Sequence, residues 1–200
     1  MPIVQLEQGS KEWLEFRRYH ITSTDAAPLM GACPWRNEMD VWNDKMGNTP
    51  NKEPNESMKR GTELEPIARR LWTEQTGLDM IPCVIQNDEY AWIATSLDGL
   101  NERHKVLIEI KCASHDVHEM AKMQEMPFYY YWQMMHHFLC TGLDDGWYIS
   151  YRPEDEEPLV YFQVKVDLED LDSLLEVEKE FWKKLCDFEQ PVWTFEQLKI

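Results

Sequence analysis

The sequence has few of the features that place a protein in a membrane or in an oxidising compartment. Its five cysteines are scattered and form no C-x-x-C pair, which argues against a disulfide framework, a zinc ribbon and a cysteine-held iron–sulfur cluster. No apolar run is long enough to span a bilayer, and the first residues, MPIVQLEQGSKEW, lack the apolar core of a signal peptide. We therefore expect a cytoplasmic protein with no membrane partner.

Basic residues are also scarce: 20 lysines and arginines stand against 37 aspartates and glutamates, and the formal net charge is −17. This balance argues weakly against nucleic-acid binding, which depends on lysine and arginine. The charge is uneven, however, because the last sixty residues hold sixteen acids and six bases, whereas basic pairs stand at 17–18, 59–60 and 69–70. Acids that bind divalent cations would also be neutralised. The charge therefore leaves a nucleic-acid partner open.

The length suits one domain over residues 1–200, because domains usually contain about 100–200 residues. Apolar residues at helical spacing predict helices, over 10–19, in a short segment between Ile21 and Gly31, and over 38–46 and 55–75. Alternating and apolar runs predict strands, over 80–86, 92–97, 106–112, 147–152 and 159–166. A long aromatic helix begins at Pro127, and a final helix runs from Asp167 to about Phe188. This order predicts an α/β (α+β) fold with a central mixed sheet flanked by helices, and a surface loop over 48–55.

The strand predicted over 106–112 carries two opposite charges in an otherwise apolar run. Side chains alternate along a strand, so Glu109 and Lys111 share one face while Ile108 and Ile110 take the other. Asp98-Gly99 opens the connection from the preceding strand, which lets the Asp98 carboxylate approach Glu109. Converging carboxylates suit Mg²⁺, with the Ile110 carbonyl as a further ligand and Lys111 beside the bound water or an attacked phosphate. The alternative is a turn pair and a surface ion pair, since D…ExK is a short pattern.

An upstream acid adds a third carboxylate. Glu65 lies in the stretch Gly61-Thr-Glu-Leu-Glu65-Pro-Ile-Ala68-Arg69 and falls inside the apolar stripe of its predicted helix. An acid that faces inward needs a base or a metal ion as its partner. The alternative is a helix-surface acid near the turn before Pro66.

Several linked motifs carry a family resemblance over roughly residues 10–150. G-x-x-x-E-P-x-A-R from Gly61 is followed by S-L-D-G from Ser96 and E-I-K-C from Glu109. The N-terminal Trp13-x-x-x-Arg17 and the stretch from Ile21, and the later Tyr130-x-x-Gln133, agree with them. In this order and spacing the chain resembles the YqaJ-type viral recombinase domain. That group contains the lambda-type alkaline exonucleases of the PD-(D/E)xK nuclease superfamily, so a restriction-endonuclease-like core is expected.

The resemblance implies a role for each matching residue. Asp98, Glu109 and Glu65 would hold two Mg²⁺ ions, for which Mn²⁺ can substitute, and Lys111 would be the catalytic lysine. The 5′-phosphate of DNA would be bound by a further set, Arg17, Thr24 and Ser96. The family usually shows I-T-A-S where this chain has Ile21-Thr22-Ser23-Thr24, so Ser23 could share the role of Thr24. A surface salt bridge is the alternative for Arg17.

Six further residues are interpreted from the sequence alone or with the family in view. Gln133 and Tyr130 would touch DNA or support the metal site, with core packing as the alternative for Tyr130. The pair His115-x-x-His118 is interpreted as surface residues, because two histidines without a third ligand rarely hold a metal. His136-His137 is interpreted as unrelated to the chemistry.

The function implied by the resemblance is a Mg²⁺-dependent 5′-to-3′ exonuclease on linear double-stranded DNA. It would release 5′-mononucleotides and leave a 3′ single-strand tail for phage-type recombination. The expected partners are double-stranded DNA ends, a single-strand annealing protein and two further copies in a toroidal homotrimer. The expected setting is the cytoplasm of a bacterial host, with the protein encoded by a phage or prophage. The alternatives are an endonuclease of the same superfamily and a non-catalytic DNA-end-binding protein. The missing cysteine cluster counts against a CRISPR-associated exonuclease.

Overall fold

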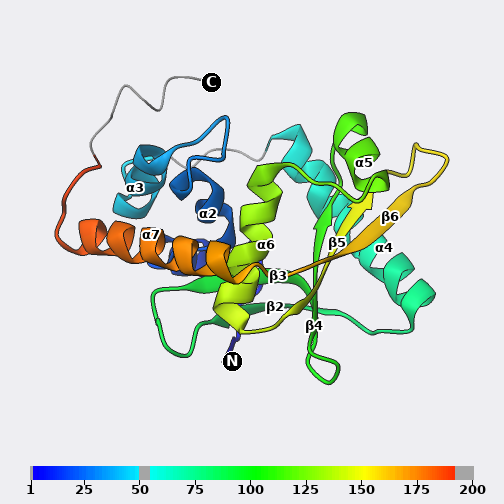
Figure 1. Ribbon diagram of the computed structural model, residues 1–200, viewed down its shortest axis with the longest axis horizontal. Helices are drawn as coiled ribbons and strands as arrows, with labels where there is room; N and C mark the ends of the chain where they lie inside the picture. Colours follow the sequence, from blue (N-terminus) through cyan, green and yellow to red (C-terminus); the bar gives the residue numbers. More distant parts are fainter. Residues whose placement is uncertain (1, 50–54, 192–200) are drawn as a thin grey trace.

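The computed structural model describes residues 2–49 and 55–191 (Figure 1). Within these residues, strands in the order β1-β2-β3-β4-β5-β6 form one six-stranded sheet. The strands are β1 (Ile3–Val4), β2 (Ile81–Gln86), β3 (Ala94–Asn101), β4 (Val106–Lys111), β5 (Asp145–Tyr151) and β6 (Leu159–Val164). Every neighbouring pair is antiparallel except β4 and β5, which are parallel. The mixed sheet with flanking helices confirms the predicted α/β fold class.

The helices fall into three groups along the chain (Figure 1). Before β2 come α1 (Lys11–Arg18), α2 (Ser23–Leu29), α3 (Glu38–Met46) and the long α4 (Glu56–Thr76). The crossover between parallel β4 and β5 contains α5 (His115–Lys122) and α6 (Phe128–Thr141), and α7 (Leu168–Cys186) follows β6. A parallel pair needs such a crossover, because a tight turn joins only antiparallel strands.

Strand β4 lies between two apolar layers. Ile108 and Ile110 pack with Trp72 of α4, whereas Leu107 on the alternate face packs in the cluster that contains Phe138 of α6. This alternation confirms the two-residue period predicted from the sequence. It places residue 109 of β4 on the α6 side of the sheet.

The N-terminal helices are fixed to the sheet and to α7 by a third cluster. Ile21, Val41 and Phe181 are buried together there. Ile21 also forms a parallel β-bridge with Ile93, in which the Ile21 N–H donates to the Trp92 carbonyl and the Ala94 N–H donates to the Ile21 carbonyl. The start of α2 is therefore held next to the strand that carries Ser96.

Strand β3 extends further than the sequence predicts. It runs through Asp98 and Gly99, so this pair does not open the connection to β4 as predicted. The register with β2 shifts between Leu97 and Leu100, which marks an irregularity at this point. Glycine is required at 99, because a Cβ there would lie 2.8 Å from side-chain atoms of Ile108. The Asp-Gly pair reflects close packing of two strands here rather than a turn.

Two elements were not predicted, the two-residue β1 and the helix α5. A strand as short as β1 has little sequence signal, since it exists only through its pairing with β2. The other helix boundaries lie within one or two residues of the prediction, and α3 matches it throughout. Residues 50–54 of the predicted loop lie outside the described residues. Among the helices of the described part, none has the length and hydropathy needed to cross a membrane.

Candidate active site

The site begins where β3 and β4 stop pairing through their backbones. Their register pairs Asn101 with Val106, and continues to Gly99 opposite Ile108. One step further, the N–H of Ile110 donates instead to the side chain of Asp98, at 2.8 Å from Oδ2. The Asp98 carboxylate therefore lies between the two strands, beside the buried face of β4.

Glu109 is the most enclosed acid of the site, with only 2 % of its surface exposed. Its Oε1 accepts hydrogen bonds from Lys111 Nζ at 2.5 Å and from Gln133 Nε2 at 2.6 Å. Its Oε2 lies 2.9 Å from Nε2 of His137. Burial alone would raise the pKa of Glu109, but Lys111 and His137 outweigh it and lower the pKa to about 2. The carboxylate is therefore ionised at neutral pH.

Two more carboxylates converge on Glu109. Burial, followed by the negative charge of Glu109, raises the pKa of both Asp98 and Glu65. Glu65 reaches the site from α4, where its carboxylate lies over Gly61: a Cβ on that glycine would be 3.2 Å from Oε1. Arg69, one turn further along α4, donates to the backbone carbonyl of Asp98. Arg69 thus joins α4 to the end of β3, next to the three acids.

Lys111 is the amine of the cluster. Burial opposes its charge, but Glu109 and Asp98 outweigh burial and hold its pKa above the ordinary lysine value. Its Nζ lies 4.7 Å from the centre of the Tyr130 ring. Tyr130 therefore covers the lysine and also packs against Tyr148, at 6.0 Å between ring centres. Tyr130 thus contacts both the lysine of the site and a buried aromatic residue of β5, while its predicted contact with DNA stays a prediction.

The donor set fits a hard divalent cation. Three carboxylates from α4, β3 and β4 interact with one ammonium, and burial, followed by the charge of Glu109, raises the pKa of Asp98 and Glu65. A divalent cation relieves such repulsion, and oxygen ligands are those that Mg²⁺ prefers. The structure thus brings together the predicted Glu65, Asp98, Glu109, Ile110 and Lys111.

The residues predicted to bind a 5′-phosphate form a second, adjoining cluster. Arg17 Nη2 donates to Thr24 Oγ1 at 2.6 Å, and its guanidinium lies 4.5 Å from the Trp13 ring centre. The indole N–H of Trp13 donates to Ser96 Oγ at 2.8 Å. Thr24 is exposed whereas Ser23 is buried, so Thr24 is the hydroxyl open to a ligand. Ser96 lies two residues before Asp98 on β3, which connects the two clusters.

A buried ion pair that the sequence did not predict supports this second cluster. Asp25 closes the capping box of α2 and accepts from Lys45 Nζ at 2.5 Å, with Arg36 at 3.7 Å. Burial raises the pKa of Asp25, but Lys45 and then Arg36 outweigh it and hold the pKa well below its usual range. Lys45 also donates to the Arg17 carbonyl at 2.9 Å. The lysine partner of Asp25 lies twenty residues away in the chain and has no signal in the sequence.

Two interpretations of histidines from the sequence were wrong. His137 is fully buried and contacts Glu109, so the pair His136-His137 is not unrelated to the site. His118 is also buried, with its ring nitrogens 2.7 Å from Ser150 Oγ and 2.9 Å from the Glu157 carbonyl. In both cases the burial depends on neighbours that are distant in sequence.

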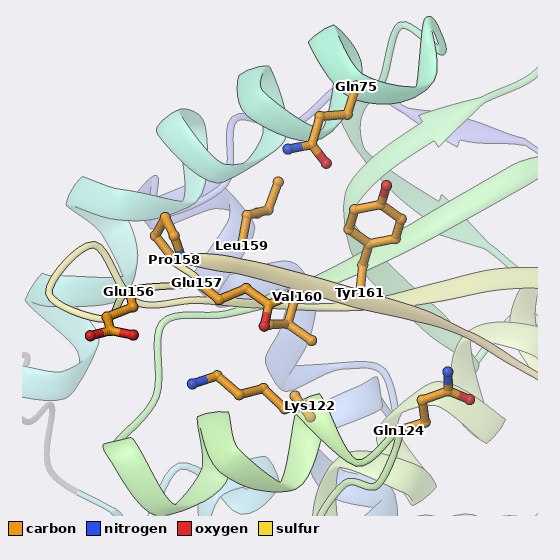
Figure 2. A pocket seen from close by; sticks show the side chains of 10 residues that line it. Gln75, Lys122, Gln124, Glu156, Glu157, Pro158, Leu159, Val160 and Tyr161 are labelled. Carbon is orange, nitrogen blue, oxygen red and sulfur yellow. The ribbon is translucent and has the colours of Figure 1, made fainter.

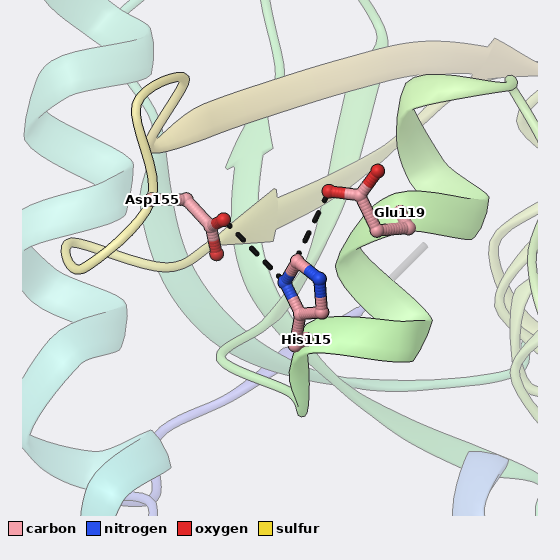
Figure 3. A group of neighbouring side chains, drawn as sticks. All are labelled: His115, Glu119 and Asp155. Carbon is pink, nitrogen blue, oxygen red and sulfur yellow. Dashed lines mark ion pairs between the residues drawn. The ribbon is translucent and has the colours of Figure 1, made fainter.

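His115 is exposed, as predicted, and belongs to a small surface cluster with Glu119 and Asp155 (Figure 3). Its Nδ1 lies 3.5 Å from Asp155 and 4.0 Å from Glu119. Lys122 neutralises Glu119 at 2.6 Å, and Arg152 neutralises Asp155 at 2.7 Å. Because both acids already have cationic partners, the cluster is a surface ion-pair network rather than a metal site.

A groove of about 550 Å³ lies along the edge strand β6, between α4 and α5 (Figure 2). Its lining includes Gln75, Lys122, Gln124, Leu159 and Tyr161. Lys122, Glu156 and Glu157 bring one base and two acids to the groove, but none of its lining residues belongs to the carboxylate cluster or to the predicted phosphate cluster. The groove is therefore separate from the candidate active site.

The comparisons with known proteins agree with this geometry. The family model described as the YqaJ-like viral recombinase domain matches residues 12–144. The structure of LHK-Exo in complex with dAMP is 26% identical, with a TM-score of 0.77, and the match covers 90% of this chain and 94% of that chain. For the alkaline exonuclease LHK-Exo from Laribacter hongkongensis the identity is 27%, the TM-score 0.76 and the coverage the same. A phage-related exonuclease from Haemophilus somnus 129PT shares the fold, with a TM-score of 0.63 at 15% identity over 86% of this chain and 97% of that one.

Two curated proteins are similar in sequence. The protein YqaJ of Bacillus subtilis (strain 168) is 25% identical over 185 residues, which cover 88% of this chain and 56% of YqaJ. A protein of Acanthamoeba polyphaga mimivirus, R354, is 24% identical over 157 residues, which cover 72% of this chain and 29% of that protein. The chain therefore spans about half the length of the first and less than a third of the second.

Proposed function

Because the chain belongs to the YqaJ-like viral recombinase domain family, we propose that it is a Mg²⁺-dependent exonuclease. It digests linear double-stranded DNA from the 5′ end, releases 5′-mononucleotides and leaves a 3′ single-strand tail for recombination by annealing. The family and the likeness to an alkaline exonuclease support a nuclease role. The observation that carries the proposal is the meeting of Glu65, Asp98 and Glu109 with Lys111, from elements far apart in the chain.

Each residue of the first cluster has a role in phosphodiester hydrolysis. Glu65, Asp98 and Glu109, with the Ile110 carbonyl, would hold the Mg²⁺ ions. Bound Mg²⁺ supplies a nucleophilic water at neutral pH and charge stabilisation at the phosphate. Lys111, held as an ammonium by Glu109, donates to the attacked phosphate or to the attacking water. Tyr130 and Gln133 fix the positions of the lysine and of Glu109.

The second cluster sets the direction of digestion. Arg17 offers a planar fork of N–H donors that matches a phosphate group. Thr24 and Ser96 add hydroxyls, and Ser96 lies two residues from Asp98. A terminal 5′-phosphate bound here places the next phosphodiester of the same strand at the carboxylates. Cleavage there releases one 5′-mononucleotide at a time.

The proposed partners follow from the family resemblance. Double-stranded DNA ends are the substrate, a single-strand annealing protein takes over the 3′ tail, and three copies form a ring around the duplex. The ring reconciles the net charge of −17 with DNA binding, because acids on its outer face repel DNA while basic residues face the channel. The protein would act in the cytoplasm of a bacterial host of the phage or prophage. Light scattering of the purified protein measures whether a trimer forms.

Linear duplexes with a 5′-phosphate or a 5′-hydroxyl, and a closed circle, test the activity. With Mg²⁺, the phosphorylated ends are digested faster than the hydroxyl ends, a label at the 5′ end appears first as a mononucleotide, and the circle stays intact. Lys111→Ala abolishes digestion, whereas Lys179→Ala, a surface lysine paired with Glu176, serves as the matched control. Cleavage of the circle at a similar rate would support an endonuclease instead. DNA-end binding without any hydrolysis would support a non-catalytic binding protein.

Arg17→Lys tests the role of the phosphate cluster separately. Lysine keeps the charge but loses the fork, so the preference for phosphorylated over hydroxyl ends falls, by roughly tenfold for one charge-assisted hydrogen bond. The rate on hydroxyl ends changes little. An unchanged preference would remove Arg17 from the proposed phosphate site.

A further inference from the structure

The second oxygen of Glu109 is held by a chain of buried side chains that neither the motifs nor the proposed roles include. Thr95 Oγ1 lies 2.6 Å from His137 Nδ1, and His137 Nε2 lies 2.9 Å from Glu109 Oε2. We propose that Thr95 and His137 are positioning residues that fix the orientation of the Glu109 carboxylate toward a divalent cation. The inference rests on the proposed function, because it takes Glu109 as a metal ligand.

The chain joins three elements of the fold. Thr95 is on β3, His137 on α6 and Glu109 on β4, and they are 1 %, 0 % and 2 % exposed. Such burial leaves the two ring nitrogens of His137 with these two partners. The chain is therefore part of the packed interior between α6 and the sheet, not a set of surface contacts.

Burial lowers the pKa of His137, so its ring is neutral at neutral pH, and the ionised carboxylate beside it then sets the hydrogen-bond directions. An ionised carboxylate only accepts, so Nε2 of His137 carries the hydrogen that points at Glu109. In a neutral imidazole the other nitrogen, Nδ1, is then an acceptor. The Thr95 hydroxyl supplies the donor that Nδ1 requires. Thr95 thereby selects the tautomer of His137 that can hold Glu109.

This arrangement has a consequence for metal binding. Lys111 and Gln133 both contact Oε1, whereas His137 contacts Oε2. Both oxygens of the Glu109 carboxylate accept hydrogen bonds, so the carboxylate cannot rotate about its last side-chain bond. Each oxygen has about two acceptor sites, so one hydrogen bond on Oε2 leaves a site free for a cation. Loss of such outer partners usually weakens metal affinity by about 10–100-fold.

The neighbouring His136 shows that the position of His137 is specific. Its Nδ1 contacts Glu178 at 2.7 Å and its Nε2 contacts the Ala94 carbonyl at 3.0 Å. His136 therefore ties α6 to α7 and to β3 and makes no contact with Glu109. Of the two histidines, His137 is the one that contacts Glu109.

Paired substitutions at Thr95 test the proposal. Thr95→Val keeps the shape and removes the hydroxyl, whereas Thr95→Ser keeps the hydroxyl. We expect Thr95→Val to weaken binding of Mn²⁺, measured by calorimetry without DNA, by about 10–100-fold. The kcat for DNA digestion falls with it, while the KM for DNA stays unchanged. Thr95→Ser, which keeps the hydroxyl, is expected to bind Mn²⁺ with an affinity within about threefold of the wild type.

Two further measurements separate this role from folding and from the proposed function. Thermal melting identifies any variant that is unfolded, and Thr95→Ala replaces Thr95→Val if valine is not accommodated. Nitrogen-15 NMR of the wild type, labelled at histidine, is expected to show hydrogen on Nε2 of His137. Hydrogen on Nδ1, or Mn²⁺ affinity of Thr95→Val and Thr95→Ala equal to that of the wild type, would overturn the proposal alone. If the wild type binds no Mn²⁺ and Glu109→Gln gives the same result as the wild type, both the proposed function and this inference are overturned.

Discussion

Gly61 stands four residues, about one helical turn, before Glu65, and Gly61→Ala is expected to change stability and activity in opposite directions. Helix side chains lean toward the N-terminus, so the Glu65 carboxylate lies over the backbone of Gly61. A Cβ at 61 would be 3.2 Å from Glu65 Oε1, which is tighter than ordinary contact. The carboxylate must then move by a few tenths of an ångström.

The magnitudes follow from these two effects. Gly61 lies inside α4, where alanine is favoured over glycine by about 0.5–1 kcal/mol. For a chain of this length that gain raises the melting temperature by roughly 1–4 °C. A displacement of 1 Å at a catalytic centre costs about 100-fold in rate, so a shift of a few tenths of an ångström costs about threefold to tenfold in kcat.

The assay combines thermal melting with digestion of a linear duplex in Mg²⁺ and with Mn²⁺ binding. Thr62→Ala is the matched control. Thr62 is the next residue of α4, is exposed, and its hydroxyl only contacts the Met58 carbonyl at 3.1 Å. It should gain a few tenths of a kcal/mol from helix propensity at unchanged activity. Gly61→Ala should be more stable, less active and weaker in Mn²⁺ affinity.

A stabilised Gly61→Ala with full activity and Mn²⁺ affinity would refute the placement of Glu65 at the cation. A destabilised variant would instead show that position 61 is crowded by a neighbour other than the flexible carboxylate. The two outcomes differ in melting temperature, so one set of measurements distinguishes them.

Three other predictions concern the interior. Burial lowers the pKa of His136, but Glu178 outweighs it and raises the pKa above 6.5. The ion pair of His136 and Glu178 therefore stabilises the folded state fully below about pH 6.5. It stabilises the folded state progressively less as the pH rises through the pKa that His136 has in the folded protein. Urea unfolding from pH 6 to pH 10 should show this decline, and Glu178→Gln should remove it. Asp25→Asn leaves buried Lys45 without its carboxylate partner and should cost about 3–5 kcal/mol in urea unfolding; a loss below 1 kcal/mol would contradict this. Trp72→Ala, at a side chain 1 % exposed, should cost about 3–5 kcal/mol while digestion well below the melting temperature persists.

The predictions that succeeded from sequence rest on local periodicity. The spacing of Glu109 and Lys111 placed both charges on one face of a strand, and their contact at 2.5 Å confirms it. The helix predicted over 55–75 forms as α4, which Asn55 and Gly77 cap in the structure. Asp98-Gly99 failed as a turn, because the same pair also suits a strand irregularity in which only glycine fits against Ile108.

By itself, the sequence determined the order of the elements other than β1 and α5, the faces of β4 and the motifs that lead to the family. Only the tertiary structure decided which distant side chains meet: Lys45 with Asp25, and Thr95 with Glu109 through His137. The reason is that local spacing sets which way a side chain points from its own helix or strand. The packing of apolar layers from the whole chain sets what lies opposite, and His137 lies opposite Glu109 because α6 packs on that face of the sheet.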